Sequence, residues 1–301
     1  MAHLQVIKGG EAMGMGLADF IWLDEDGDLC VKKRSILIGK DERGDPAPIV
    51  DRWSINSAVH GNLILVPCNY LPDPTRPEPS YIVLCEVRGE DDVCKDWNHR
   101  AKLRDAMDDR GKQANLVWFG FEQKYELDEQ GDSENDVFEA RRFLTAERHI
   151  GACFDAGILF HSAWNDPAAS DGWDFKVGVR GFPQDLDPDP PNALVVSDHL
   201  IIARYLMEKV AAGKGLAPDW DSVDIQVSTA ALREPGAEQN AVLEEMEDRL
   251  RPLDGKTRRV PHPSRGNCRC IELGRDDPAD PYILAHDVLT AVWPLETLKA
   301  K

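Results

Sequence analysis

The ten residues from Trp118 to Leu127 constrain this chain more than any other stretch of similar length. They read Trp-Phe-Gly-Phe-Glu-Gln-Lys-Tyr-Glu-Leu, and the pattern predicts a strand over 116–127. Glu122 and Lys124 lie within this strand, so it is a candidate for a functional site and not only for a hydrophobic core. The rest of the chain has to supply the partners of these two charged residues.

The chain is predicted to form two domains with a boundary at about residue 92. Residues 1–92 read as short strands joined by turns and a proline-rich crossing, which predicts a small β-rich domain. Residues 93–301 read as strands alternating with helices, which predicts a second domain. The chain is therefore expected to contain both strands and helices.

The second domain is expected to contain a capped helix and a strand near its middle. A helix is expected over 198–212, because Ser197 can cap its start and Gly213 follows its end. A strand is expected over 223–229.

The charge balance excludes several classes of partner. The chain has 301 residues, of which 54 are acidic and 35 basic, giving a formal net charge of −19. Such a surface repels nucleic-acid phosphates and anionic lipids, so neither nucleic acid nor membrane is an expected partner, although a local basic pocket can bind a small anion. The start of the chain lacks the layout of a secretion signal. The seven cysteines are odd in number and lie mostly in apolar runs, which predicts reduced thiols in a cytoplasmic protein.

A series of motifs, in order along nearly the whole chain, carries a family resemblance. Trp118–Leu127 resembles W-F-G-x-E-Q-E-Y, Trp173–Gly178 resembles W-E-F-Q-x-G, Ser197–Tyr205 resembles G-D-H-L-W-x-A-R-F, and Ser228–Glu234 resembles S-T-K-A-M-R-E. Their shared order and spacing identify the chain as similar to the eukaryotic-type glutamine synthetases. The resemblance implies an α+β fold with an N-terminal β-grasp domain and a C-terminal antiparallel sheet that forms a funnel. In that family ATP phosphorylates the side chain of glutamate, divalent cations lie between the two substrates, and ammonia displaces the phosphate.

The resemblance implies one metal site with oxygen ligands. Glu122 matches the first glutamate of E-Q-E-Y, Asp224 falls at the place of a family histidine, and Glu272 matches a glutamate near the C-terminus. Carboxylate oxygens are the ligands that Mg²⁺ prefers. One Mg²⁺ ion, held by these three residues and acting with ATP, is therefore expected.

The second metal site of the family is not expected here. Lys124 stands where the family has the second glutamate of E-Q-E-Y, Pro167 replaces another ligand, and only Asp174 of this set can ligate. An ammonium group in this place repels a divalent cation. Either Lys124 and Asp174 form a buried structural ion pair, or Lys124 provides a catalytic positive charge where the ion sat.

The remaining site candidates come from arginines and other residues that match the family motifs. Arg265 and Arg275 match arginines that bind phosphate and carboxylate, a task suited to the bidentate guanidinium. The resemblance assigns nucleotide binding to Trp118, Ser228 and Arg258. These residues complete the expected active site.

Two further patterns are expected to be structural. His199 lies at a helix start in the family match, which favours a structural over a catalytic role. Cys268 and Cys270 lie in a strand without a second cysteine pair, which favours the core over a zinc site.

The family residues that this chain lacks restrict its expected activity. Asn56 stands where the family has an ammonia-handling aspartate, and the flap glutamate is missing, so synthesis of glutamine itself is not expected. The first hypothesis is a repurposed enzyme of specialised metabolism that acts on an amino-acid-like carboxylate, as an ATP-dependent amide-bond ligase with one Mg²⁺. The second is an ATP-independent enzyme that uses Lys124, and the third is a catalytically silent homologue that regulates or assembles with another synthetase. A homo-oligomer is expected because the family builds rings with active sites between subunits.

Overall fold

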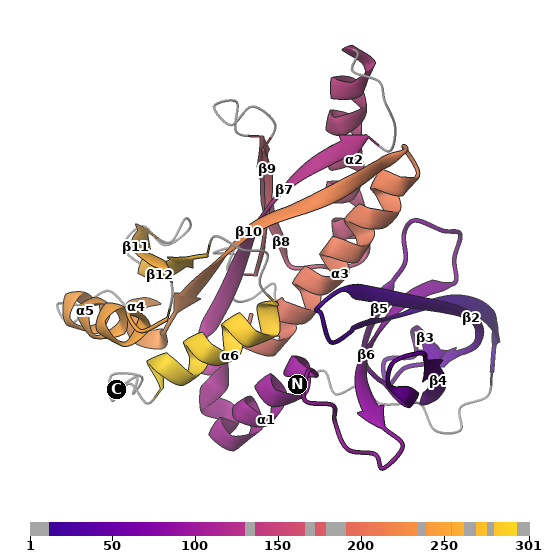
Figure 1. The fold of residues 1–301 in the computed structure, drawn as a ribbon, viewed down its shortest axis with the longest axis horizontal. Coiled ribbons are helices and arrows are strands. Elements are labelled where there is room, and N and C mark those ends of the chain that lie inside the picture. The colour runs from indigo at the N-terminus through magenta and orange to yellow at the C-terminus, as the bar shows by residue number, and fades with distance from the viewer. Residues whose placement is uncertain are drawn as a thin grey trace. The chain divides into compact units, whose positions relative to one another are not determined.

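The computed structural model describes residues 12–129, 136–165, 172–178, 191–233, 239–253, 255–261, 269–275 and 280–293. The chain divides into two compact units, one up to Ala101 together with Asp155–Gly157, the other comprising Lys102–Phe154 and the residues from Ile158 onward. Each unit contains its own six-stranded sheet (Figure 1). The expected α+β class is confirmed, whereas the division at residue 92 stays a prediction.

The sheet of the first unit has the order β3-β2-β1-β6-β5-β4. Strands β1 and β6 pair in parallel, and all other neighbours are antiparallel. The β1–β2 turn forms because the Asp24 side chain accepts hydrogen bonds from the backbone of Asp26 and Asp28, while Gly27 adopts a φ of 83°. The strands are β1 (Gly14–Leu23), β2 (Leu29–Lys40), β3 (Pro46–Ile49), β4 (Trp53–Ser57), β5 (Gly61–Pro72) and β6 (Ser80–Gly89).

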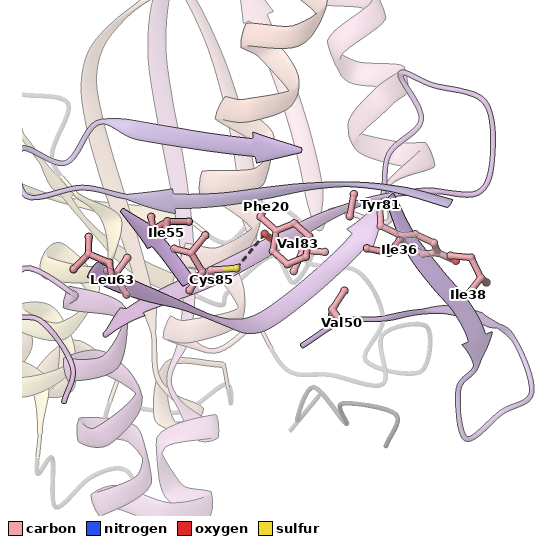
Figure 2. Close-up of a cluster of buried hydrophobic side chains, with 12 residues drawn as sticks. Phe20, Ile36, Ile38, Val50, Ile55, Leu63, Tyr81, Val83 and Cys85 are labelled. Carbon is pink, nitrogen blue, oxygen red and sulfur yellow. Dashed lines mark hydrogen bonds between the residues drawn. The ribbon is translucent and has the colours of Figure 1, made fainter. Parts of the chain in front are cut away.

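One face of this sheet carries the core of the first unit. Tyr81, Val83, Cys85 and Val87 of β6 face the same cluster, since alternate side chains of a strand point to one face. Phe20 lies among them and is fully buried (Figure 2). Burial also raises the pKa of the Cys85 thiol well above its ordinary value, so this cysteine acts as a small apolar residue.

The sheet of the second unit has the order β11-β12-β10-β7-β9-β8, and every neighbouring pair is antiparallel. This confirms the antiparallel second sheet. The strands are β7 (Trp118–Glu129), β8 (Phe160–Asn165), β9 (Trp173–Gly178), β10 (Leu216–Ser228), β11 (Lys256–Pro261) and β12 (Arg269–Gly274). The helical elements are α1 (His99–Arg110), η1 (Gly111–Leu116), α2 (Asp136–Asp155), α3 (Ala193–Ala212), α4 (Ala230–Arg233), α5 (Gln239–Leu250) and α6 (Pro281–Val292).

Helix α3 is the main helix packed on this sheet. It contacts β7, β9 and β10, runs along β10 in Figure 1, and also packs against α6. Its apolar residues are buried almost throughout its length, which is why a long helix is stable there. None of the helices that the structure describes combines the length and apolar character that a membrane span requires.

The start of α3 differs from the prediction. The helix begins at Ala193 and its N-cap is Asn192, whose side-chain oxygen accepts a hydrogen bond from Val195 N at 3.0 Å. Ser197, the expected cap, lies inside the helix and its buried hydroxyl donates to Pro281 O at 3.3 Å. The predicted end is confirmed, because α3 ends at Ala212 and Gly213 follows as its C-cap.

Candidate functional site

The register of the second sheet brings most of the expected site residues together. Strand β7 lies between β10 and β9, and Glu122 of β7 is opposite Asp224 on one side and Lys176 on the other. Lys124 lies opposite Asp174 of β9. Since alternate residues of a strand point to one face, Glu122 and Lys124 share a face. We refer to this side of the strands as the charged face.

Glu272 joins the charged face from β12. It lies opposite Gln226 of β10 and Arg258 of β11. Gln226 Nε2 donates to Glu272 Oε2 at 3.0 Å, and Arg258 Nη2 lies 2.5 Å from Glu272 Oε1. The three carboxylates expected to bind a metal therefore come from neighbouring strands, namely Glu122 on β7, Asp224 on β10 and Glu272 on β12.

The two other carboxylates are also paired with basic side chains from adjacent strands. Lys176 Nζ contacts Glu122 Oε2, as an ionic contact without the geometry of a hydrogen bond. Lys124 Nζ lies 3.4 Å from Asp224 Oδ2 and forms a hydrogen bond with it. Glu122, Asp224 and Glu272 therefore all lie in ion pairs, which link neighbouring strands from β11 to β9.

The expected pairing of Lys124 with Asp174 is corrected. Asp174 is buried and lies opposite Lys124, but the ion pair of Lys124 is with Asp224. Strand β10 shifts its register between Trp220 and Val223, so no residue of β10 lies directly opposite Lys124, and its long side chain reaches diagonally to Asp224. The Lys124 side chain is 43% exposed, so this is not the buried pair that was expected.

The surrounding charges keep Lys124 protonated. Burial lowers the pKa of Lys124, but the carboxylates of Asp224, Glu122 and Asp221 outweigh burial, and the pKa is raised above the ordinary 10.5. Burial raises the pKa of Asp224, Lys124 partly opposes this, and the nearby Glu272 and Glu122 add to it. A protonated Lys124 supplies positive charge and hydrogen bonds, but it cannot serve as a general base near neutral pH.

The charged face does not fit the expected Mg²⁺ ion. The three carboxylates have the right chemistry for it, yet basic groups contact the oxygens that the ion would need. An ammonium group at that distance repels a divalent cation. Within the described ranges, no group of three or more His, Cys, Asp or Glu residues is arranged to hold a metal ion.

Two of the three residues assigned to nucleotide binding, Trp118 and Ser228, lie together at one end of β7 and β10, whereas Arg258 lies on β11 beside Glu272. Trp118 lies opposite Ser228 in the register, and Ser228 has no exposed surface. The guanidinium of Arg233 lies 3.8 Å from the centroid of the Trp118 ring, and it donates to Ser228 O and to Leu116 O, each at 2.8 Å. Arg233 therefore covers the indole, and the nucleotide-binding role of Trp118 and Ser228 stays a prediction.

Some of the other residues singled out in the sequence lie in the described part of the structure, and others do not. Arg275 directly follows β12 and is partly exposed, whereas Arg265, Pro167 and Cys268 lie outside the described residues. Burial raises the pKa of the Cys270 thiol to about 12, which agrees with a place in the core. His199 has a structural role, since its Nδ1 accepts a hydrogen bond from Leu159 N at 3.0 Å.

Sequence reasoning missed Lys176 and Arg233. Lys176 lies within the Trp173–Gly178 motif, where it replaces the glutamine of W-E-F-Q, so the substitution itself was a signal. Its meaning depends on Glu122, which only the register of β7 and β9 places beside it.

Comparison with known proteins finds relatives that share the name glutamine synthetase. No protein-family model matches the chain. It is 27% identical to a glutamine synthetase of Eremothecium gossypii over 79% of this chain and 69% of that protein. It is 27% identical to a glutamine synthetase of Kluyveromyces lactis over 74% of this chain and 65% of that protein. A chloroplastic glutamine synthetase of Chlamydomonas reinhardtii is 26% identical over 80% of this chain and 71% of its own length.

All of these relatives are named glutamine synthetases, and the two-sheet α+β structure is consistent with a glutamine-synthetase-like fold. These relatives support placing the chain as a divergent member of the glutamine synthetase family. It spans about two thirds of the length of the curated relatives that it matches.

Proposed function

We propose that this protein is a repurposed enzyme of the glutamine synthetase family that acts on an amino-acid-like carboxylate at the charged face. The observation that carries the proposal is the alternation of basic and acidic side chains on neighbouring strands. Ammonium and guanidinium groups are suited to bind the carboxylate of a substrate, and carboxylates are suited to bind its amino group. A zwitterionic substrate therefore matches this face better than an uncharged one.

The first candidate reaction is ATP-dependent amide-bond formation, which the names and class of the relatives support. ATP would phosphorylate the substrate carboxylate, and an amine would then displace phosphate. The positive charges of Lys124, Lys176 and Arg258 would offset the charge of the transferring phosphoryl group. Glutamine is not the proposed product, because Asn56 replaces the ammonia-site aspartate of the family. The role in specialised metabolism is part of this proposal.

The second candidate is an ATP-independent reaction at the same face. It is favoured by the ion pairs of Glu122 and Asp224, which occupy the carboxylates that a metal–nucleotide complex would use. In this reaction Lys124 stabilises developing negative charge, since its raised pKa excludes a role as a base.

The proposal is tested by isothermal titration calorimetry with L-glutamate and related amino acids, with and without a non-hydrolysable ATP analogue. The wild type should bind one of these carboxylates, and Lys176→Gln should weaken binding by about tenfold or more, the effect of one charge-assisted hydrogen bond. Lys214→Gln is the matched control, because Lys214 is exposed, lies outside the charged face and loses the same charge.

Release of ADP in the presence of the bound acid and an amine would support the ligase. Carboxylate binding without any nucleotide binding at millimolar concentration would support the ATP-independent enzyme. A protein that binds neither compound would contradict the proposal, and a regulatory or assembly role would then be left.

A further inference from the structure

We infer that Lys124 and Lys176 take the place of divalent cations at the charged face, so that this face binds an anionic ligand without a metal ion. The identity of that ligand rests on the proposed function. The occupation of the carboxylates by lysines rests on the structure alone and can be tested without any substrate.

The first argument is that the lysine is the more exposed partner in each ion pair. The Glu122 and Asp224 side chains are 10% and 11% exposed, whereas Lys176 and Lys124 are 28% and 43% exposed. The lysines therefore cover the carboxylates on the side that solvent reaches. An anion that approaches from solvent meets ammonium groups first, although the whole chain is strongly acidic.

The second argument is the availability of ligand oxygens. Mg²⁺ requires carboxylate oxygens at about 2.0–2.1 Å in a nearly octahedral arrangement. Lys176 Nζ is in contact with Glu122 Oε2, and Lys124 Nζ lies 3.4 Å from Asp224 Oδ2. A cation between Glu122 and Asp224 would have to displace both ammonium groups and leave them next to its own charge.

The third argument is the arrangement of the lysines around the two carboxylates. Glu122 and Asp224 lie opposite each other on β7 and β10, Lys176 is on β9 on the far side of β7, and Lys124 is two residues along β7. Both lysines come from strands of the sheet, so the backbone ladder holds them near the carboxylates. The positive charge is therefore a fixed part of the fold.

The test uses Mn²⁺ alone as the probe, with free Mn²⁺ measured by electron paramagnetic resonance. We compare the wild type with the double variant Lys124→Gln, Lys176→Gln, which frees both carboxylates while keeping the length of the side chains. The matched control is Lys33→Gln, Lys214→Gln, because both of those lysines are exposed and lie outside the charged face. The control changes the net charge by the same amount.

The wild type and the control should show no saturable Mn²⁺ binding. The double variant should bind one equivalent of Mn²⁺, with an affinity at least about tenfold higher than that of either of them. Saturable binding by the wild type that Glu122→Gln abolishes would overturn the inference. A folded double variant that binds no better than the control would overturn it as well.

If the double variant does not fold, the single variant Lys176→Gln is read by the same criteria. Failure of the proposed function would be seen separately, as a wild type that binds no amino-acid-like carboxylate.

Discussion

His149 shows how burial sets the chemistry of a single residue in this protein. It lies on α2, 1% exposed, with its ring against the rings of Phe160 and Phe175. Its Nε2 lies 3.0 Å from Ala203 O and 3.2 Å from Cys153 Sγ. Burial lowers the pKa of His149 to about 4, and the backbone hydrogen bond to Ala203 opposes this only in part. The imidazole is therefore neutral in the folded protein.

We expect His149 to make stability fall as the pH falls. The pKa of His149 is about 4 in the folded state and 6.5 ordinarily, so below pH 6.5 the unfolded chain takes up the proton first. The contribution is fully present above pH 6.5 and is lost progressively towards pH 4, up to about 3 kcal/mol. Urea unfolding at pH 7.5, 6.0 and 5.0 measures this decrease in the free energy of unfolding.

The variant His149→Gln is the comparison for this prediction. Glutamine keeps a donor for Ala203 O but does not titrate, so the loss of free energy of unfolding between pH 7.5 and 5.0 should be smaller. An equal loss in the variant and the wild type would show that other groups cause the pH dependence.

At the scale of secondary structure, the pairing of β7 with β10 decides where the charged face lies. The strand expected over 116–127 is confirmed as Trp118–Glu129. The strand expected over 223–229 is longer, since β10 runs from Leu216 to Ser228 and pairs with β7 along that length. Backbone pairing with a neighbour extends a strand beyond its local pattern.

We expect the cap of α3 to be a measurable source of stability. Asn192→Ala removes the acceptor for Val195 N and the hydrogen bond to Asn115 Oδ1 at 3.1 Å, and it should lower the free energy of unfolding by about 1–2 kcal/mol. Asn192→Ser keeps a capping side chain and should lower the free energy of unfolding by less than Asn192→Ala does.

Ser197→Ala is the informative control, because Ser197 is the cap that the sequence predicted. It should cost about 1 kcal/mol or less, the value of one hydrogen bond to Pro281 O. Chemical denaturation of all three variants gives the order, and a larger loss for Ser197→Ala than for Asn192→Ala would argue against the cap at Asn192.

At the scale of the whole molecule, the excess of acidic residues is the dominant electrostatic feature. The formal net charge is −19 and the isoelectric point calculated from the sequence is about 4.8. Like charges on one compact chain repel each other and destabilise the folded state, and salt screens this repulsion.

We expect salt to stabilise the protein at pH 7.5. Raising NaCl from about 10 to about 200 mM shortens the Debye length from about 30 Å to less than 10 Å, and should raise the thermal midpoint by a few degrees. Differential scanning fluorimetry measures the midpoint. At pH 5.0, near the isoelectric point, the same change should have little effect, and a salt effect as large as at pH 7.5 would contradict self-repulsion as the cause.

Much of the fold could be predicted from the sequence, because the motifs that carry it are local. The run from Trp118 to Leu127 is long and apolar enough to indicate a strand, and Gly213 marks the end of α3. The start of α3 could not be predicted in the same way, because Asn192 and Ser197 are both residues that can cap a helix. The choice between them depends on the length of helix that the sheet beneath α3 buries.

The sequence by itself determined the α+β class, the family resemblance and the replacement of a metal-binding glutamate by Lys124. The tertiary structure decided the partner of that lysine. Lys124 and Asp224 are 100 residues apart, and they meet because β10 pairs with β7 and shifts its register between Trp220 and Val223. Lys176 reaches Glu122 through the pairing of β9 with β7. Strand register and bulges arise from contacts between distant segments, so the local sequence pattern cannot specify which charges become neighbours.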